Sequence, residues 1–317
     1  MLRATWVVGG LGCDDGSDSC GDSANRFPSD YAPPMTTEQR GLRIVDSPGV
    51  RRITIDHPPI NLFDATLGSS LGAALREVAG DSAVGVVVID SADPDFFIPH
   101  ADVVGLASRG AVPAGPVPDT VGAGQGLALF LRSMPQLTIV AIAGRVGGGG
   151  AEFSAACDIR YGVVGRFVLC QPEIAVGLLP VGLGATQMLP RLVGRGRSLE
   201  IIVGADDIDA QTAERWGWLN RAFATVEDMA AFVDRFVDRV ATFPLGLVAT
   251  AKQLVGHAEI DPGPGLLEET RSFGPLLSSP DAQTRMQAFL RSGGQERGGE
   301  IDLQSTISKL APQGGDR

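Results

Sequence analysis

Four consecutive glycines, Gly147–Gly150, separate an apolar run from the start of a helix-like pattern. Glycine lacks a Cβ atom, so the backbone can approach a ligand closely and can adopt positive φ angles. The free N–H groups at a helix start favour negative charge, which suits a phosphate or a developing oxyanion. The run is neither a P-loop nor a GxGxxG motif. The glycines alone are equally compatible with a tight strand-to-helix turn that binds nothing.

Two carboxylates accompany this turn. Glu152 follows the glycines directly, and we expect it in the first turn of the helix, facing whatever the N–H groups bind. Glu173 lies in Gln171-Pro172-Glu173, ahead of a segment rich in glycine, leucine and proline. Two carboxylates beside preorganised donors can transfer protons near a carbonyl group. Each acid alone could equally be a solvated or capping residue, and their spacing does not show that they meet.

The overall composition excludes several classes of protein. The chain has 317 residues, of which 44% are apolar, so it can form a core and is not disordered throughout. No apolar run approaches the 18 residues or so of a membrane span. The net charge of −11 disfavours binding along a nucleic acid, but it allows one small phosphorylated ligand.

The cysteines indicate neither a disulfide framework nor a metal site. They lie at 13, 20, 157 and 170, without a CxxC motif or a histidine cluster. No base is evident near Cys170, so we expect a packed thiol there. The first residues are too glycine-rich for a signal peptide, and a cytoplasmic location is therefore the default expectation.

The elements that must position the acids alternate between strand and helix. We expect a hairpin from Leu42–Val45 and Arg51–Ile55, and a helix capped by Asp64. Buried strands are predicted at Val84–Asp90 and Leu137–Ala143. Short helices are predicted at Leu129–Met134 and Ala151–Cys157, and Thr225 with Asp228 should cap a further, amphipathic helix. Such alternation favours an α/β fold with parallel strands.

The same patterns divide the chain into four parts. Residues 1–40 read as a disordered arm, with Met35 as an alternative start, and residues 41–195 as the α/β core. Residues 196–291 read as a helical region, and residues 292–317 as a loose tail. Gly110–Gly126 reads as a mobile surface loop.

Four segments resemble the enoyl-CoA hydratase/isomerase (crotonase) family. They are Pro59-Ile60-Asn61, Phe96–Val103, Ala143–Asp158 and Gln171–Gly194, and Ala213–Arg221 and Ala251-Lys252 fit as well. The resemblance covers about residues 40–255. It implies a spiral of ββα units with a helical C-terminal region, assembled as homotrimers or pairs of trimers. It also implies acyl-CoA thioester substrates, with coenzyme A as part of the substrate and no separate cofactor or metal.

The resemblance also assigns roles to individual residues. The Gly149 N–H would bind the thioester oxygen of an enolate, Glu152 would activate the water that adds at Cβ, and Glu173 would give a proton to Cα. Further contacts to the CoA thioester would come from the following residues: Ile60, Pro99, His100, Ala101, Asp102 and Gly148.

One departure from the family pattern concerns the second oxyanion donor, which we expect from the loop Phe97–Asp102. The donor position aligns with Pro99, which has no N–H, and His100 follows at a usually glycine position. Our hypothesis is that His100 replaces the donor through its N–H or its ring; the alternative is a half-built oxyanion hole. The ring could also be a packed or exposed loop residue. A second departure is one extra residue between Asp158 and Glu173, which could displace Glu173.

The leading functional hypothesis is hydration of a trans-2-enoyl-CoA to the 3-hydroxyacyl-CoA, as in fatty-acid β-oxidation. Double-bond isomerisation, decarboxylation and thioester hydrolysis remain open, as does a CoA-thioester-binding protein without turnover. For the CoA phosphates, Arg51, Arg52 and Lys252 are candidate partners, although each could also be merely solvated.

Overall fold

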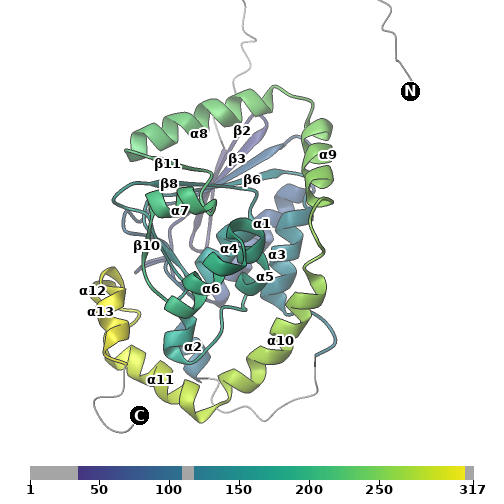
Figure 1. Cartoon of the computed structure of the whole chain (residues 1–317). Coiled ribbons are helices and arrows are strands. Elements are labelled where there is room, and N and C mark those ends of the chain that lie inside the picture. Colours follow the sequence, from purple (N-terminus) through teal and green to yellow (C-terminus); the bar gives the residue numbers. More distant parts are fainter. Residues whose placement is uncertain (1–34, 109–117, 311–317) are drawn as a thin grey trace, which may run out of the picture. The chain divides into compact units, whose positions relative to one another are not determined.

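The computed structural model describes residues 35–108 and 118–310. Strands alternate between two sheets as the chain proceeds, and helices cover the sheets (Figure 1). Successive strands β4, β6 and β8 lie in a seven-stranded sheet, whereas β5, β7 and β9 lie in a four-stranded one. Two strands followed by helical structure therefore form the repeating unit, as the expected spiral of ββα units requires.

The strands of the seven-stranded sheet, in spatial order, are β1 (Met35–Gln39), β2 (Leu42–Ser47), β3 (Val50–Ile55), β4 (Val86–Ser91), β6 (Leu137–Ile142), β8 (Ile159–Val163) and β11 (Arg221–Phe223). Those of the four-stranded sheet are β10 (Ile208–Asp209), β9 (Val168–Cys170), β7 (Arg145–Gly147) and β5 (Phe96–Ile98). From β3 to β11 all pairings in the larger sheet are parallel, and β2 with β3 forms the predicted antiparallel hairpin.

The helices of the first half are α1 (Ala65–Ala79), α2 (Val103–Ser108), α3 (Ala123–Ser133), α4 (Gly148–Ala156) and the 3₁₀ helix η1 (Glu173–Val176). Those that follow are α5 (Ala185–Val193), α6 (Arg195–Gly204), α7 (Ala210–Trp216), α8 (Val226–Ala241), α9 (Leu245–Gly256), α10 (Gly263–Leu277), α11 (Pro280–Arg291), α12 (Arg297–Ile301) and α13 (Leu303–Ser308).

The predicted helix caps are present. The Asp64 carboxylate accepts the Leu67 N–H at the start of α1, and the Thr225 hydroxyl accepts the Asp228 N–H at the start of α8. The buried stripe of α8, which includes Val233 and Val237, packs on side chains of β4, β6 and β8. The opposite face of the larger sheet packs against α1, α3 and α4 in the main core. No described helix is long and apolar enough to cross a membrane.

Three sequence predictions about secondary structure were wrong. The arm predicted to extend to residue 40 ends earlier, because β1 begins at Met35 and pairs with β2. Part of the predicted loop Gly110–Gly126 is helical, since α3 begins at Ala123; residues 109–117 lie outside the described residues. The predicted loose tail contains α12 and α13, and Glu300 and Leu303 within them are fully buried. β1 gains its structure from the adjacent strand, whereas Glu300 of α12 is held by His100, 200 positions earlier.

Candidate active site

The turn between β7 and α4 brings the glycines against the neighbouring strand β5. A Cβ atom on Gly147 would lie 2.4 Å from the Pro99 carbonyl oxygen, and one on Gly150 would lie 2.2 Å from that of Ile98. Gly148 has a φ of +46°, which also favours glycine. Because α4 begins at Gly148, the Gly149 N–H belongs to the helix start and has no intrahelical partner. Glu152 therefore lies in the second turn of α4, not in the first as predicted.

Glu152 is buried, with 2% of its surface exposed. Its Oε2 accepts the N–H groups of Leu183 and Gly184, the latter at 2.7 Å, at the start of α5. Burial raises the pKa of Glu152 above its ordinary value, although these backbone N–H groups favour the charged form and oppose the rise. The start of α5 therefore holds one oxygen of this carboxyl group in place.

Glu173 lies on the other side of the glycine turn. Its Oε1 is 2.6 Å from the position that a Cβ atom on Gly148 would occupy. Its Oε2 is buried and has no hydrogen-bond partner among the described residues. Burial raises the pKa of Glu173 well above its ordinary value, and the charge of Glu152 raises it further. The charge of Glu152 acts on Glu173, so the two carboxyl groups lie near each other, beside the glycine turn.

The amide that lies beside Gly149 is that of Ala101. The Ala101 nitrogen is 3.9 Å from the position of a Cβ atom on Gly149, and Leu183 Cδ1 is 3.8 Å from it. A parallel bridge to Phe63 fixes this loop: the Phe63 N–H donates to the His100 oxygen at 2.9 Å, and the Asp102 N–H donates to the Phe63 oxygen at 3.3 Å. The Ala101 N–H itself has no partner among the described residues. The missing N–H of Pro99 therefore does not remove a donor beside Gly149.

The ring of His100 does not donate a hydrogen bond beside Gly149. The ring is buried; Nδ1 lies 2.7 Å from the Ala101 carbonyl oxygen, and Nε2 lies 2.8 Å from Glu300 Oε1. Both ring nitrogens are thus engaged, and the ring version of the replacement-donor hypothesis is wrong. The partner that draws the ring away lies in α12, which the sequence patterns did not reveal as ordered.

Comparison with known proteins identifies the family of this chain. The family model for enoyl-CoA hydratase/isomerase matches residues 46–294. The chain belongs to the enoyl-CoA hydratase/isomerase family.

Individual relatives of this family match most of the chain. The "Probable enoyl-CoA hydratase" of Rhizobium meliloti is 31% identical over 251 residues, covering 78% of this chain and 94% of the relative. The crotonyl-CoA hydratase of Syntrophomonas wolfei is 29% identical over 219 residues, covering 68% and 82%. A crystal structure of a "putative enoyl-CoA hydratase" from Streptomyces avermitilis has a TM-score of 0.78 and 36% identity, covering 87% of this chain and all of that one. Membership confirms the crotonase fold and an enzyme that acts on acyl-CoA.

The remaining contact residues that the crotonase resemblance implied differ in exposure. Ile60 is fully buried, and Pro99 is buried with its carbonyl against Gly147. Asp102 accepts a hydrogen bond of 2.9 Å from the Gln295 side chain, so this carboxylate is engaged with the C-terminal segment. Gly148 lies between Glu173 and His100. Of the predicted contact residues, Pro99, His100 and Ala101 lie against the glycine turn.

The cations that sequence reasoning offered to the CoA phosphates are already paired. Arg51 binds Asp46 and Glu77, and Arg52 binds Asp90 and Asp234. Lys252 binds Asp158 at 2.8 Å and donates to two backbone carbonyl oxygens. These three residues serve the fold.

Sequence reasoning missed a third buried carboxyl group, Glu269 of α10. It accepts the Thr186 hydroxyl and, at 3.4 Å, the Gln125 amide. Burial raises the pKa of Glu269 to about 7, and the nearby charge of Glu152 contributes to the rise. The sequence signal was an acid on a helix face that also contains the buried Leu266.

The two cysteines within the described residues are unsuited to nucleophilic catalysis. Cys157 and Cys170 are buried and free, and burial raises the pKa of Cys157 to about 12. Among the described residues no cluster of His, Cys, Asp and Glu could hold a metal ion. Two cavities, of about 740 and 420 Å³, lie around α9 and are lined by residues such as Arg132 and Lys252. Neither is lined by Glu152 or Glu173.

Proposed function

We propose that this enzyme hydrates a trans-2-enoyl-CoA to the 3-hydroxyacyl-CoA. The observation that carries the proposal is the convergence of two backbone amides, Gly149 and Ala101, with two buried carboxyl groups, Glu152 and Glu173. The amides suit a thioester oxygen that gains negative charge as the enolate forms. Fixed dipoles at that point lower the barrier more than they aid substrate binding.

The two acids have surroundings that suit opposite roles. Two N–H groups at the start of α5 favour the ionised form of Glu152, which can take a proton from water as its oxygen bonds to Cβ. Only the backbone N–H of Glu173 itself opposes the effect of its burial, and the charge of Glu152 adds to that effect, so Glu173 keeps its proton and can deliver it to Cα. The net change is the addition of one water molecule across the double bond. Coenzyme A is part of the substrate, and no other cofactor is required.

The test is the loss of enoyl absorbance after addition of crotonyl-CoA. Wild type should be active, and Glu173→Gln should lose about 10³-fold in kcat, a typical contribution of one general acid. Retention of activity by Glu173→Gln on a 3-enoyl-CoA would favour isomerisation, which can work with one acid–base group. Binding of CoA thioesters without any reaction would favour a binding protein.

We also propose that the enzyme forms a homotrimer or a pair of trimers and acts in the cytoplasm. The support for assembly is α9, which has no buried residue. Large apolar side chains in and just after it are exposed, namely Leu247, Leu254, Val255 and Ile260. Several large exposed apolar side chains on one short segment favour association. Sedimentation analysis of wild type and of Leu254→Glu tests it; a monomeric wild type would contradict it.

A further inference from the structure

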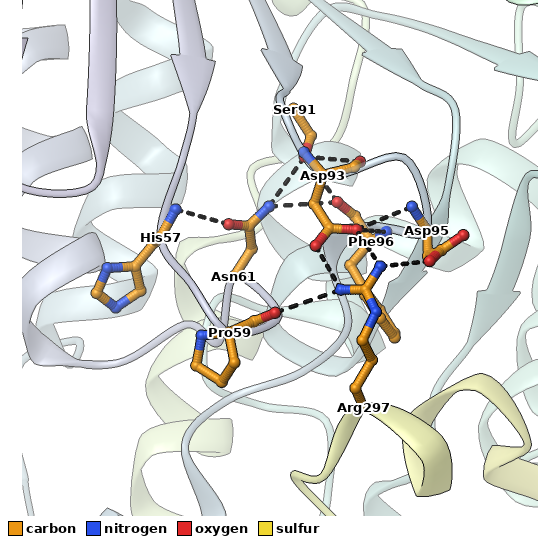
Figure 2. A network of polar contacts seen from close by, with 8 residues as sticks. All are labelled: His57, Pro59, Asn61, Ser91, Asp93, Asp95, Phe96 and Arg297. Carbon is orange, nitrogen blue, oxygen red and sulfur yellow. Dashed lines mark hydrogen bonds and ion pairs between the residues drawn. The ribbon is translucent and has the colours of Figure 1, made fainter.

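The segment Gln295–Glu300 holds the loop that contains Ala101. The Gln295 side chain donates to Asp102 at 2.9 Å and accepts the Val104 N–H at 2.9 Å. Arg297 binds Asp93 at 2.7 Å and also binds Asp95, on the turn that precedes β5 (Figure 2). These hydrogen bonds join the segment Gln295–Glu300 to the residues before and after β5.

The third link is the buried pair His100–Glu300. The side chains are 4% and 0% exposed, and His100 Nε2 lies 2.8 Å from Glu300 Oε1. The same oxygen accepts the Gln295 N–H at 2.7 Å, as an ionised carboxylate would. The edge of Phe289 packs against the imidazole.

The contacts determine which atoms of His100 carry protons. A carbonyl oxygen only accepts, so Nδ1 must donate to the Ala101 oxygen. Nε2 faces the carboxylate and must donate as well, which makes the ring an imidazolium. Burial lowers the pKa of His100, but the charge of Glu300 and the hydrogen bonds to Glu300 and Ala101 together outweigh burial, and the pKa is raised.

The Ala101 peptide is therefore held on both sides. The Phe63 bridge holds the flanking groups of His100 and Asp102, and the His100 ring holds the Ala101 carbonyl oxygen. The Ala101 N–H shares a planar peptide unit with the His100 carbonyl oxygen, which the Phe63 N–H holds. The His100 ring fixes the next peptide unit through the Ala101 oxygen, so the two bonds together restrict rotation about Ala101. We propose that the His100–Glu300 pair is a positioning device that keeps the Ala101 N–H directed at the same point as the Gly149 N–H, as the second oxyanion donor.

This role rests on the proposed function, and it makes the donor sensitive to pH. The charged groups near His100 are Glu300, Arg145 with its partner Asp207, Glu173 across Gly148, and Asp102 in the same loop. Below the raised pKa of His100, the ring is an imidazolium beside the Glu300 carboxylate, and its Nδ1 holds the Ala101 peptide. As the pH rises through that pKa, the ring loses one of its two N–H protons. The Glu300 carboxylate favours the tautomer that keeps the proton on Nε2, so Nδ1 no longer donates to the Ala101 oxygen and the donor is released.

The main experiment compares wild type with Glu300→Gln in crotonyl-CoA hydration across pH. We expect kcat to fall about tenfold with KM changed less than about threefold, since the lost interaction acts in the transition state. The alkaline loss of activity should begin at lower pH, because the His100 pKa is no longer raised. Asp281→Asn, which removes the exposed Asp281–Arg285 pair of α11, is the matched control and should resemble wild type.

The double variant His100→Gln with Glu300→Gln covers the case in which the single variant does not fold. A neutral pair cannot titrate, so the part of the alkaline loss that His100 causes should be absent, and only the loss from deprotonation of Glu173 should remain. A double variant with the pH profile of wild type would overturn the proposal. So would a folded Glu300→Gln enzyme with wild-type kcat and pH profile.

A measurement without turnover separates this proposal from the proposed reaction. The carbonyl stretch of crotonyl-CoA, bound to the slow variant Glu173→Gln, reports the hydrogen bonds to the thioester oxygen. Adding Glu300→Gln should reduce the shift of that stretch from its value in water. An unchanged shift overturns the positioning role even if hydration is confirmed. A reduced shift together with an inactive wild type refutes the hydratase proposal alone, and absence of thioester binding refutes both.

Discussion

The glycine turn at the start of α4 and the loop after β5 each present one amide at the same place, yet they are held in different ways. The turn depends on residues about 50 positions earlier, because Cβ atoms on Gly147 and Gly150 would meet the backbone oxygens of Pro99 and Ile98. The loop depends on Glu300, 200 residues away from His100. The difference shows that the two halves of one site can differ in how far along the chain their support lies.

The support also differs in chemistry. The turn is held by close backbone contacts, which depend little on pH. The loop is held by the buried ion pair His100–Glu300. Removing one partner of such a pair leaves the other charge buried and unpaired. We therefore expect the turn to fail when side-chain volume is added and the loop to fail when charge is removed.

The largest effect should come from adding volume to the turn. In Gly148→Ala, the new Cβ would lie 2.6 Å from Glu173 Oε1 and 3.0 Å from the His100 Cβ, at a positive φ. We expect kcat for crotonyl-CoA hydration to fall by about 10²–10³-fold, as when an oxyanion donor is lost. Gly126→Ala, in which the Cβ meets nothing within 4 Å, is the control and should leave kcat unchanged. Equal activity of the two variants would remove the contrast between turn and loop.

Glu269→Gln tests the buried carboxyl group whose pKa the charge of Glu152 helps to raise. The Glu269 pKa of about 7 lies above that of an exposed glutamate. Its raised pKa therefore contributes stability that is present below about pH 4.5 and is lost as the pH rises to about 7. The variant should lack this loss. Between pH 4.5 and pH 8 its free energy of unfolding should therefore rise relative to that of wild type by up to about 3 kcal/mol, at about 1.4 kcal/mol per pKa unit.

Urea unfolding of both proteins at the two pH values measures this gain. A parallel pH dependence of the two free energies of unfolding would show that Glu269 does not titrate in this range.

Asn61→Ala tests the support of β5 by the turn that precedes α1, which Arg297 of α12 also contacts through the Pro59 oxygen. The Asn61 amide donates to Ser91 and to the Phe96 carbonyl oxygen and accepts the His57 N–H (Figure 2). Its loss leaves buried groups unpaired, and we expect about 2 kcal/mol of destabilisation. Thermal unfolding measures it, with Asn220→Ala as the comparison, because Asn220 is exposed and its side chain accepts one backbone N–H. A larger loss in Asn220→Ala would contradict this ranking.

The smallest effect should follow Arg297→Gln. This side chain is 40% exposed, and partly exposed ion pairs contribute little. We expect kcat to fall by no more than about threefold, because the His100–Glu300 pair remains. A loss as large as that of Glu300→Gln would show that α12 acts as a whole and not through its buried pair.

Much of the site could be predicted from sequence because its signals are local. The strand, four glycines and Glu152 occupy one continuous segment, and the caps at Asp64 and Thr225 involve groups three residues apart. The alternation of strands and helices predicted the fold class for the same reason. Position within the turn was less accurate: α4 begins within the glycines, which moved Glu152 to the second turn.

Which amide lies beside Gly149, and what holds it, was decided by tertiary structure. Sequence alignment of the loop favoured Pro99 and His100, whereas packing against Phe63 and the turn puts Ala101 there. α12 carries few apolar residues and reads as loose, because its order comes from polar contacts of Glu300 with His100 and of Arg297 with Asp93, on either side of β5. Local composition determines which segments can form helices and strands. Contacts between residues hundreds of positions apart have no local pattern, so they became visible only in the folded chain.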